Sequence, residues 1–226
     1  MRFSIILPSF LGNYPNSASN KEHKFMRAIE SVLSQSFEDW ELVIVSDGCD
    51  KTVELAKPLF YEYMPKIKLI QIDKQSLWSG KVRNTGIFKS EGDLITYLDA
   101  DDMLGTDHLK IIDSAFNGFD WVWYNDYSYD KGIQAFNEHG ISLVLGKCGT
   151  SNITHLRVLN VWWNNSTYKH DWIMIQTLKA RSKNYAKIQT PEYLICHCPH
   201  LLDYDGDEKI LNPKNNETII AQNSPS

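Results

Sequence analysis

The chain has 226 residues, 42% of them hydrophobic and 12% aromatic, which is enough apolar material for one large folded domain and excludes general disorder. Its 28 acidic and 23 basic residues give a net charge of −5, which excludes the broad basic surface that non-specific nucleic-acid binding requires. No apolar run is long enough to cross a membrane, and four cysteines are too few for a disulfide framework. We therefore expect a cytoplasmic protein with at most peripheral membrane association.

Short apolar runs alternate with amphipathic stretches along the first hundred residues. These patterns predict strands at 3–7, 40–45, 68–72 and 93–98 and helices at 22–35, 51–63 and 80–90. Residues 9–21 are rich in Asn, Ser, Gly and Pro and are predicted to form a long loop. Because strands and helices alternate at this spacing, we expect an α/β fold, with a mostly parallel sheet and helices on both of its faces.

The second half of the chain has less regular patterns. Strands are predicted at 121–124, 141–145 and 193–198, and helices near 106 and at 172–180. Neither a repeat nor a linker divides residues 1–202, which we expect to fold as a single domain. Polar residues dominate 203–226, and this composition predicts a loose C-terminal tail.

Three carboxylates follow the strand predicted at 93–98. Asp99, Asp101 and Asp102 lie within four residues. Like charges this close raise one another's pKa and are costly unless a cation neutralises them, and oxygen ligands favour Mg²⁺ or Mn²⁺. The alternative is an acidic start to the helix near 106, with the carboxylates capping that helix. Asp102 is the member best explained as a structural residue.

Five sequence blocks occur in order over the first hundred residues: Phe3–Phe10, Ala28–Phe37, Glu41–Gly48, Arg83–Ile87 and Tyr97–Asp102. Together they resemble the nucleotide-binding half of the family 2 glycosyltransferases, which have the Rossmann-like GT-A fold. The resemblance implies an inverting transferase that uses a nucleotide-diphosphate sugar and Mn²⁺ or Mg²⁺. Its acceptor would be a hydroxyl of a glycan or lipid-linked molecule, as in polysaccharide biosynthesis. Residues 1–105 would then bind the donor and residues 106–202 the acceptor.

The resemblance also implies which residues bind the nucleoside. Pro8, Ser9 and Phe10 match positions that line the base and the ribose, and Phe10 would stack on the base. Asp47 matches the carboxylate that accepts a hydrogen bond from the uracil imide, so a UDP-sugar is the default donor. Ser46 stands where the family usually has a further acidic residue.

Other positions match the part of the family site that holds the diphosphate and the sugar. Arg83 and Asn84 match a basic and polar pair there, with Lys81 as a further cation. For Arg83 the alternative is a solvated charge on a helix. Asp99 matches the acid nearer the ribose and the donor sugar, and Asp101 matches the direct metal ligand.

Inverting transfer needs a base that takes the proton of the acceptor hydroxyl. In the family this is commonly an Asp at the start of a helix in the second half. Asp171 has that context, with His170 in place of the usual acid, so it is our candidate base; the alternative is a helix N-cap. His170 either orients Asp171 or faces solvent. The next candidates for the base are Asp126 and Asp130.

Two further groups in the second half have roles that the sequence leaves open. His197 follows the last predicted strand, where the family often has a histidine near the donor phosphates and the metal, and His200 is the alternative. The aromatic residues Trp162, Trp163 and Tyr168 either form a platform for an acceptor sugar or belong to the core.

Two other functions are also considered. Haloacid-dehalogenase-like phosphatases carry Asp-x-Asp after their first strand, whereas here the motif follows the fourth. A catalytically degenerate relative would bind a nucleotide sugar or a partner without turnover, and His170 in place of an acid favours that interpretation. The loop at 11–21 would overhang the nucleotide pocket in either nucleotide-binding protein, as a closing lid or as a mobile segment.

Overall fold

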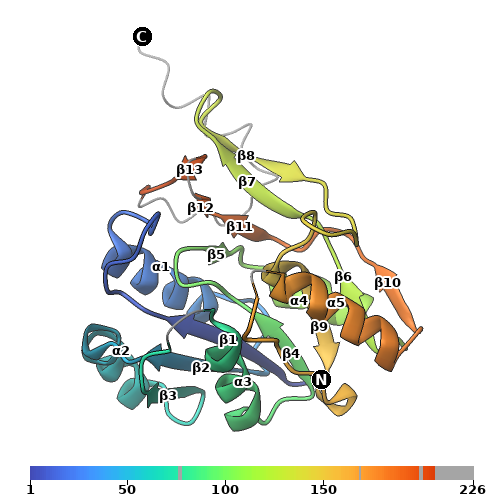
Figure 1. The fold of residues 1–226 in the computed structure, drawn as a ribbon, viewed down its shortest axis with the longest axis horizontal. Coiled ribbons are helices and arrows are strands. Elements are labelled where there is room, and N and C mark those ends of the chain that lie inside the picture. Colours follow the sequence, from blue (N-terminus) through green and yellow to red (C-terminus); the bar gives the residue numbers. More distant parts are fainter. Residues whose placement is uncertain (76–77, 168, 199–200, 207–226) are drawn as a thin grey trace.

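The structure is a computed structural model that describes residues 1–75, 78–167, 169–198 and 201–206 (Figure 1). Its helices are α1 (Lys21–Leu33), α2 (Asp50–Glu62), α3 (Gly80–Lys89), α4 (His108–Ala115) and α5 (His170–Arg181), with the 3₁₀ helices η1 (Thr150–Asn152) and η2 (Arg157–Leu159). Its strands are β1 (Phe3–Ser9), β2 (Trp40–Asp47), β3 (Ile67–Ile72), β4 (Leu94–Tyr97), β5 (Met103–Leu104), β6 (Trp121–Trp123), β7 (Asp126–Asp130), β8 (Ala135–His139), β9 (Ile153–Leu156), β10 (Tyr185–Lys187), β11 (Tyr193–Ile195), β12 (His197–Cys198) and β13 (Leu202–Asp203). None of the helices in these ranges is long and apolar enough to span a lipid bilayer.

A mostly parallel sheet runs through the centre of the molecule, with the strand order β10–β6–β9–β4–β1–β2–β3 (Figure 1). β1 pairs in parallel with β2 and β4, and β2 pairs in parallel with β3. β9 is antiparallel to both of its neighbours. All residues of β1 and β2 are buried, as expected for parallel strands covered on both faces. The carboxyl ends of β1, β2 and β4 therefore meet at one edge of the sheet.

Helices cover both faces of this sheet. Phe3, Ile5 and Leu7 of β1 pack in one hydrophobic cluster with residues of α1, α2 and α4. Ile6 points to the opposite face and packs with residues of α3 and α5. This alternation follows from the two-residue period of a strand. The predicted α/β fold, with a mostly parallel sheet between helices, is confirmed.

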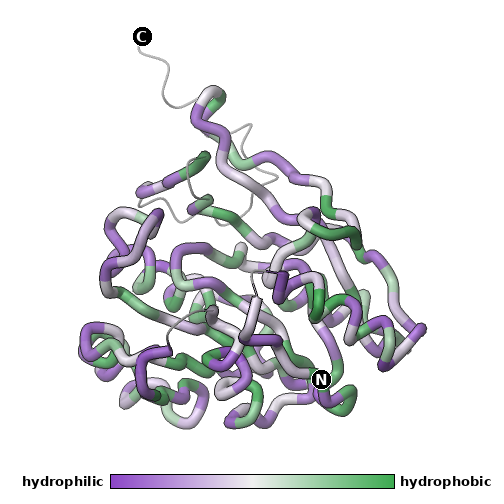
Figure 2. Tube along the Cα trace, in the orientation of Figure 1, coloured by the Kyte–Doolittle hydropathy of each residue, from purple (hydrophilic) through white to green (hydrophobic). Residues whose placement is uncertain are grey.

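The strand predicted at 141–145 is wrong. The Val144 N–H donates to the Ser142 carbonyl (2.8 Å), and the Lys147 N–H donates to the Val144 carbonyl (3.1 Å), so local turns use these backbone groups. Val144 and Leu145 are each 51% exposed, so only Ile141, which is buried, and Leu143 of this apolar run pack inward. The second sheet, β5–β11–β7–β8, instead uses the hairpin β7–β8, which the sequence analysis missed. Hydrophilic colours predominate along that hairpin (Figure 2), so its sequence lacks the apolar signal of a strand.

The start of the expected C-terminal tail is ordered. β13 pairs with β12, and the carboxylates of Asp203 and Asp205 both form ion pairs with the ammonium group of Lys24 on α1. The prediction that a loose tail begins at residue 203 therefore places its start too early. The sequence does not reveal this, because ion pairs between residues so far apart in the chain leave no local pattern. Residues 207–226 lie outside the described residues.

Glu41, at the start of β2, is a completely buried carboxylate at the sheet edge opposite the ends of β1 and β4. It accepts hydrogen bonds from Ser4 Oγ (2.6 Å) and the backbone N–H groups of Glu91 and Gly92, and it pairs with Lys68 (2.9 Å). Burial raises the pKa of Glu41, but these donors outweigh that effect and lower it from 4.5 to about 2. Its stabilising contribution is thus complete above pH 4.5 and is lost as the pH falls toward 2.

We predict that Glu41→Gln lowers the free energy of unfolding at pH 7 by about 2 kcal/mol, because the amide replaces a charged acceptor. The loss should shrink as the pH approaches 3, which urea unfolding at the two pH values would measure. Glu54→Gln is the control, since Glu54 is 69% exposed and should change stability by less than about 0.5 kcal/mol. An equal loss at both pH values would contradict the assignment.

Candidate active site

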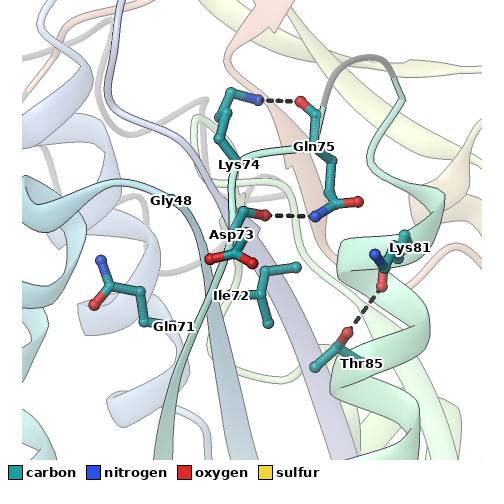
Figure 3. Close-up of a pocket in the computed structure, with 8 residues that line it drawn as sticks. All are labelled: Gly48, Gln71, Ile72, Asp73, Lys74, Gln75, Lys81 and Thr85. Atoms are coloured by element: carbon teal, nitrogen blue, oxygen red, sulfur yellow. Dashed lines mark hydrogen bonds between the residues drawn. The ribbon is translucent and has the colours of Figure 1, made fainter.

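A cavity of about 700 Å³ opens beyond the carboxyl ends of β1, β2 and β4. Its lining comes from the loop after β1, the ends of these strands, and α3 with the segment before it: Pro8, Ser9, Phe10, Leu11, Asn13, Tyr14, Ala18, Lys21, Asp47, Lys74, Gln75, Trp78, Ser79, Val82, Arg83, Asp99, Ala100 and Asp101. A neighbouring cavity of about 740 Å³ shares Lys74 and Gln75 with it and lies between the end of β3 and α3 (Figure 3). Ser9, Asp47 and the acidic cluster thus converge at one sheet edge, as expected for residues at the carboxyl ends of neighbouring parallel strands.

Asp47 ends β2 and is bonded to the segment that follows β3. Its carboxylate accepts from Lys74 Nζ (2.6 Å) and from the Gln75 N–H (2.7 Å). Gly48, the next residue, has a φ of 63°, and a Cβ there would lie 2.5 Å from the backbone nitrogen of Lys74. This close approach of the two backbones therefore requires glycine. Lys74 and Gln75 were not among the predicted site residues. They could have been found from their position shortly after β3, because the carboxyl end of this strand lies at the same sheet edge as Asp47.

The residues after β1 contribute two aromatic rings, Phe10 and Tyr14, to the lining of the cavity. Pro8 and Ser9 are buried at the end of β1, and Ser9 Oγ hydrogen-bonds to Thr52 Oγ1 (3.0 Å). The Phe10 ring lies 4.2 Å from Lys74 Nζ and 6.1 Å from the Tyr14 ring. Burial and then the charges of Asp101 and Asp99 raise the pKa of Tyr14 to about 12. A flat ring, a cation and a carboxylate thus face one cavity, which suits a planar, polar ligand.

Arg83 on α3 is held against the acidic cluster. Its Nη2 donates to Asp99 Oδ1 (2.6 Å), its Nη1 donates to Ser79 Oγ, and its guanidinium lies 5.2 Å from the Trp163 ring. Because Arg83 is only 4% exposed, the alternative of a solvated helix charge is wrong. A buried cation that faces the cavity can bind an anionic ligand.

Asn84 and Lys81 do not point into this cavity. The Asn84 side chain donates to the Trp163 carbonyl (2.9 Å) and accepts from the Trp163 N–H (2.8 Å), so its amide is bonded to the backbone of the second half. Lys81 is exposed and lines the neighbouring cavity instead (Figure 3). Of the predicted diphosphate group, the structure brings only Arg83 to the acidic cluster.

The acidic residues differ in their surroundings. Asp102 is buried and accepts from Tyr193 OH (2.9 Å) and the Cys196 N–H (2.8 Å), which ties the turn to β11 and supports its expected structural role. Burial and then the charge of Asp99 raise the pKa of Asp101 to about 6. The N-cap of α4 is Asp107, and the side chain that accepts from the first turn of this helix is Gln35, whose Oε1 accepts from the Leu109 N–H (3.1 Å). The capping alternative for Asp99 and Asp101 is therefore wrong.

The site offers oxygen donors that suit Mg²⁺ or Mn²⁺. Asp99 and Asp101 both line the cavity, and the one positive charge of Arg83, which pairs with Asp99, faces two carboxylates. A divalent cation could neutralise the negative charge that this leaves. Within the described ranges, no three His, Cys, Asp or Glu side chains are grouped to hold a metal by themselves. The ring nitrogens of His197 contact Asp203 Oδ1 (3.2 Å) and the Asn16 carbonyl (3.1 Å), so metal binding by His197 would require it to exchange one of these partners. His200 lies outside the described residues.

Asp171 lies in the first turn of α5. Its Oδ1 accepts from Thr150 Oγ1 (2.7 Å), and its Oδ2 is 3.7 Å from His170 Nε2. Lys169 is the N-cap of α5 and Asp171 is the second residue of the helix, so the N-cap alternative for Asp171 is wrong. The His170 side chain is 12% exposed, which contradicts the expectation that it faces solvent and places it beside Asp171.

Aromatic rings connect α5 to the cavity. The His170 ring stacks on Trp78 at 6.1 Å and lies 5.9 Å from the ring of Trp163. Trp78, which lines the cavity, was missed because the loop before α3 has no periodic pattern. Trp163 is 3% exposed and belongs to the core, whereas Trp162 is 42% exposed. Tyr168 lies outside the described residues.

The other two candidates for the base lie on β7, the hairpin strand. Asp126 is buried, accepts from Asn152 Nδ2 (2.8 Å) and contacts His139 Nδ1 (3.1 Å). Asp130, at the other end of β7, accepts from the Gly132 N–H (2.7 Å). None of the three candidates lines the cavity that holds Asp99 and Arg83. Asp171 is favoured because it adjoins His170, whose ring stacks on the lining residue Trp78.

Comparisons with known proteins agree with this architecture. The family model described as glycosyl transferase family 2 matches residues 17–184. An uncharacterised glycosyltransferase of Haemophilus influenzae is 32% identical over 108 residues, which are 47% of this chain and 39% of the relative. The poly(ribitol-phosphate) beta-N-acetylglucosaminyltransferase TarP of Staphylococcus aureus is 29% identical over 150 residues, which are 66% of this chain and 37% of TarP. The chain thus spans less than half the length of these curated relatives.

Solved structures show the same fold. Residues 1–349 of S. aureus TarS in complex with UDP-GlcNAc superpose with a TM-score of 0.68 at 16% identity, over 92% of this chain and 60% of that one. The corresponding complex with UDP gives a TM-score of 0.66 at 17% identity, over 86% and 60% of the two chains. The family match covers most of the chain and includes α1, β2 and the acidic turn after β4. This chain belongs to glycosyl transferase family 2.

Proposed function

We propose that this protein is an inverting, metal-dependent glycosyltransferase that moves a sugar from a nucleotide-diphosphate donor to a hydroxyl of a glycan or lipid-linked acceptor. One observation carries the proposal: buried Arg83 and the carboxylates of Asp99 and Asp101 face the same cavity that Asp47 and Phe10 line. Such a cavity matches a ligand that has a planar base at one end and a charged diphosphate at the other.

A UDP-sugar is the proposed donor. The chain resembles the fold of TarS, which was solved with UDP and with UDP-GlcNAc, and the carboxylate of Asp47 is the acceptor that a uracil imide would need. Lys74 and the Gln75 N–H occupy that carboxylate here, so UDP would exchange at least one of these bonds for its own. Residues 1–105 would bind this donor and residues 106–202 the acceptor.

The positions of the site residues suggest a separate role for each in the proposed reaction. Mn²⁺ or Mg²⁺ bound at Asp101 and Asp99 would neutralise negative charge on the departing diphosphate. Arg83 would bind the same diphosphate as a fixed cation. Asp171 would accept the proton of the acceptor hydroxyl as that oxygen attacks the anomeric carbon, and Thr150 would orient its carboxylate.

The protein should therefore release UDP from UDP-GlcNAc or another UDP-sugar more slowly without an acceptor than with one, and only with Mn²⁺ or Mg²⁺ present. Thermal shifts with UDP-, GDP-, CDP- and dTDP-sugars, each with and without Mn²⁺, would identify the base. Binding without any release of nucleotide would instead favour the degenerate relative, the alternative that rests on His170 standing where the family usually has an acid. Membership of family 2 argues against the phosphatase alternative, and steady hydrolysis of a phosphomonoester would be needed to revive it.

Trp78 should contribute to binding of the donor sugar rather than of the nucleotide, because its indole lies between the cavity and His170 and offers an apolar surface to a sugar ring. We predict that Trp78→Ala weakens binding of the UDP-sugar about tenfold, equivalent to about 1.4 kcal/mol, and leaves UDP affinity nearly unchanged. Calorimetry with the two ligands measures the difference. Trp162→Ala is the matched control, and equal losses for UDP and UDP-sugar would contradict the prediction.

A further inference from the structure

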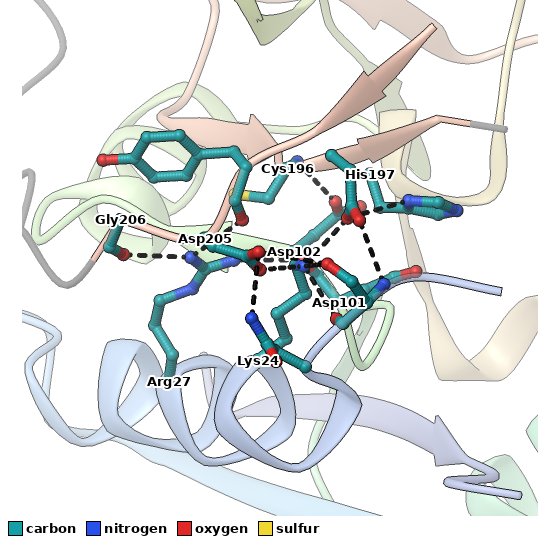
Figure 4. A network of polar contacts seen from close by, with 12 residues as sticks. Lys24, Arg27, Asp101, Asp102, Cys196, His197, Asp205 and Gly206 are labelled. Carbon is teal, nitrogen blue, oxygen red and sulfur yellow. Dashed lines mark hydrogen bonds and ion pairs between the residues drawn. The ribbon is translucent and has the colours of Figure 1, made fainter. Parts of the chain in front are cut away.

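Lys24 of α1 is a completely buried cation beside the cavity. Its side chain is 0% exposed, and its Nζ donates to the Ser19 carbonyl (2.8 Å), to Asp203 Oδ1 (2.8 Å) and to Asp205 Oδ1 (Figure 4). An ammonium group has three N–H donors, so these partners use all of them. A buried charge must be compensated in this way to be tolerated. The C-terminal segment is thus joined to α1 by an ion-pair cluster.

The same two carboxylates also hold the loop that precedes α1. Asp203 Oδ2 accepts from the Ser19 N–H (3.0 Å), and Asp205 Oδ2 accepts from Ser19 Oγ (3.0 Å) and Asn20 Nδ2 (3.0 Å). Although burial raises the pKa of both carboxyls, the bonds from Lys24 and Ser19 outweigh it and hold each pKa below its ordinary value. Both groups therefore remain charged and bonded at neutral pH.

A third contact set reaches the acidic turn. Arg27, one helical turn after Lys24, donates from Nη1 to the carbonyls of Tyr204 (3.3 Å) and Gly206 (3.1 Å). Its Nη2 donates to the carbonyl of Asp101 (3.3 Å). Arg27 thus joins the C-terminal segment to the backbone of the residue that is the predicted metal ligand (Figure 4).

We propose that residues 203–206, which we call the strap, hold the loop of residues 11–20 over the donor cavity through Lys24. Asn13, Tyr14 and Ala18 of this loop line the cavity, so the loop is a wall whose position decides whether a nucleotide finds a formed site. Lys24 is a positioning residue that acts through Ser19, Asp203 and Asp205 and does not itself line the cavity. The inference rests on the proposed nucleotide-sugar function of the cavity.

The test uses Lys24→Met in the full chain, because methionine keeps most of the side-chain volume and removes the charge. Hydrogen–deuterium exchange of the backbone amides in the loop should be faster in the variant without any ligand. UDP affinity should fall on the order of tenfold, since part of the population no longer presents a formed wall. The rate of UDP-sugar hydrolysis at saturating donor should stay within about twofold, which separates positioning from chemistry.

Two further variants keep the proposal falsifiable. Asp205→Asn changes a carboxylate that is 42% exposed, so it should fold even where Lys24→Met does not, and it should show the same effects more weakly. Lys51→Met is the matched control: Lys51 is 39% exposed and pairs with Glu22 and Glu54 away from the strap, so loop exchange and UDP affinity should not change.

Unchanged exchange of the loop amides in the folded variants would overturn the proposal. It would also be overturned if UDP affinity stayed constant while the hydrolysis rate and the melting temperature fell together. The two arms separate the hypotheses: if the unaltered protein binds no UDP, the proposed function fails, whereas loop exchange still decides whether the strap holds the loop.

Discussion

Replacing Asp171 by Asn is expected to lower kcat by a factor on the order of 10²–10⁴ while donor affinity stays nearly unchanged. The amide cannot accept the proton of the acceptor hydroxyl, but it can still accept the hydrogen bond from Thr150, so the local structure should survive. Since Asp171 is not the N-cap of α5, loss of a cap would not confuse the result. Steady-state kinetics on the true acceptor and a UDP titration measure the two quantities.

Asp126→Asn and Asp130→Asn are the controls for this experiment, because these residues were the next candidates for the base. Asp130→Asn should leave kcat unchanged. Asp126→Asn should lower stability, since Asp126 is buried and bonded to Asn152, with kcat of the folded fraction preserved. If Asp171→Asn retains most of its activity and one of the other variants loses it, the base has been assigned to the wrong strand or helix.

Asp101→Asn should abolish the Mn²⁺-dependent part of UDP binding and leave the fold intact. The substitution is nearly isosteric and removes a charge that burial and Asp99 already disfavour, as the raised pKa of Asp101 indicates. The metal-free protein should therefore be equally stable or slightly more stable. Calorimetric titration of UDP with and without Mn²⁺ measures the effect.

Asp102→Asn is the informative control for Asp101. Asp102 bonds Tyr193 and the backbone of Cys196, so its replacement should lower the melting temperature while the Mn²⁺ dependence of UDP binding persists. Unchanged Mn²⁺-dependent UDP affinity in Asp101→Asn would rule out Asp101 as the metal ligand.

The sequence predicts best those helices and strands whose buried side chains recur with a regular period. Phe3–Leu7 and the amphipathic helix after the first loop follow the periods of a buried strand and of a helix that packs on a sheet. Their places in β1 and α1 therefore agree with the structure. The convergence of Asp47, Asp99 and Asp101 also follows from topology alone, because carboxyl ends of parallel strands meet at one edge.

The contacts that the sequence could not predict depend on tertiary arrangement. Consecutive residues of a helix point about 100° apart, so the Arg-Asn pair at 83–84 cannot reveal which member faces the cavity. Lys74 and Trp78 lie outside helices and strands, where the sequence has no hydrophobic period. Lys24 pairs with two carboxylates that lie 179 and 181 residues further along the chain. Such pairings leave no local trace in the sequence.

The bond between Asn84 and the Trp163 backbone has a consequence for the order of events in a two-substrate reaction. Arg83 and Asn84 are neighbours on α3. Arg83 faces the cavity, whereas the Asn84 side chain hydrogen-bonds to the backbone of Trp163, whose ring packs on His170. A donor that bound at Arg83 and moved α3 would therefore also move Trp163, which packs on His170 beside Asp171. If the cavity binds the proposed donor, this double attachment of α3 would favour an order in which the donor binds first and sets the geometry that the acceptor meets.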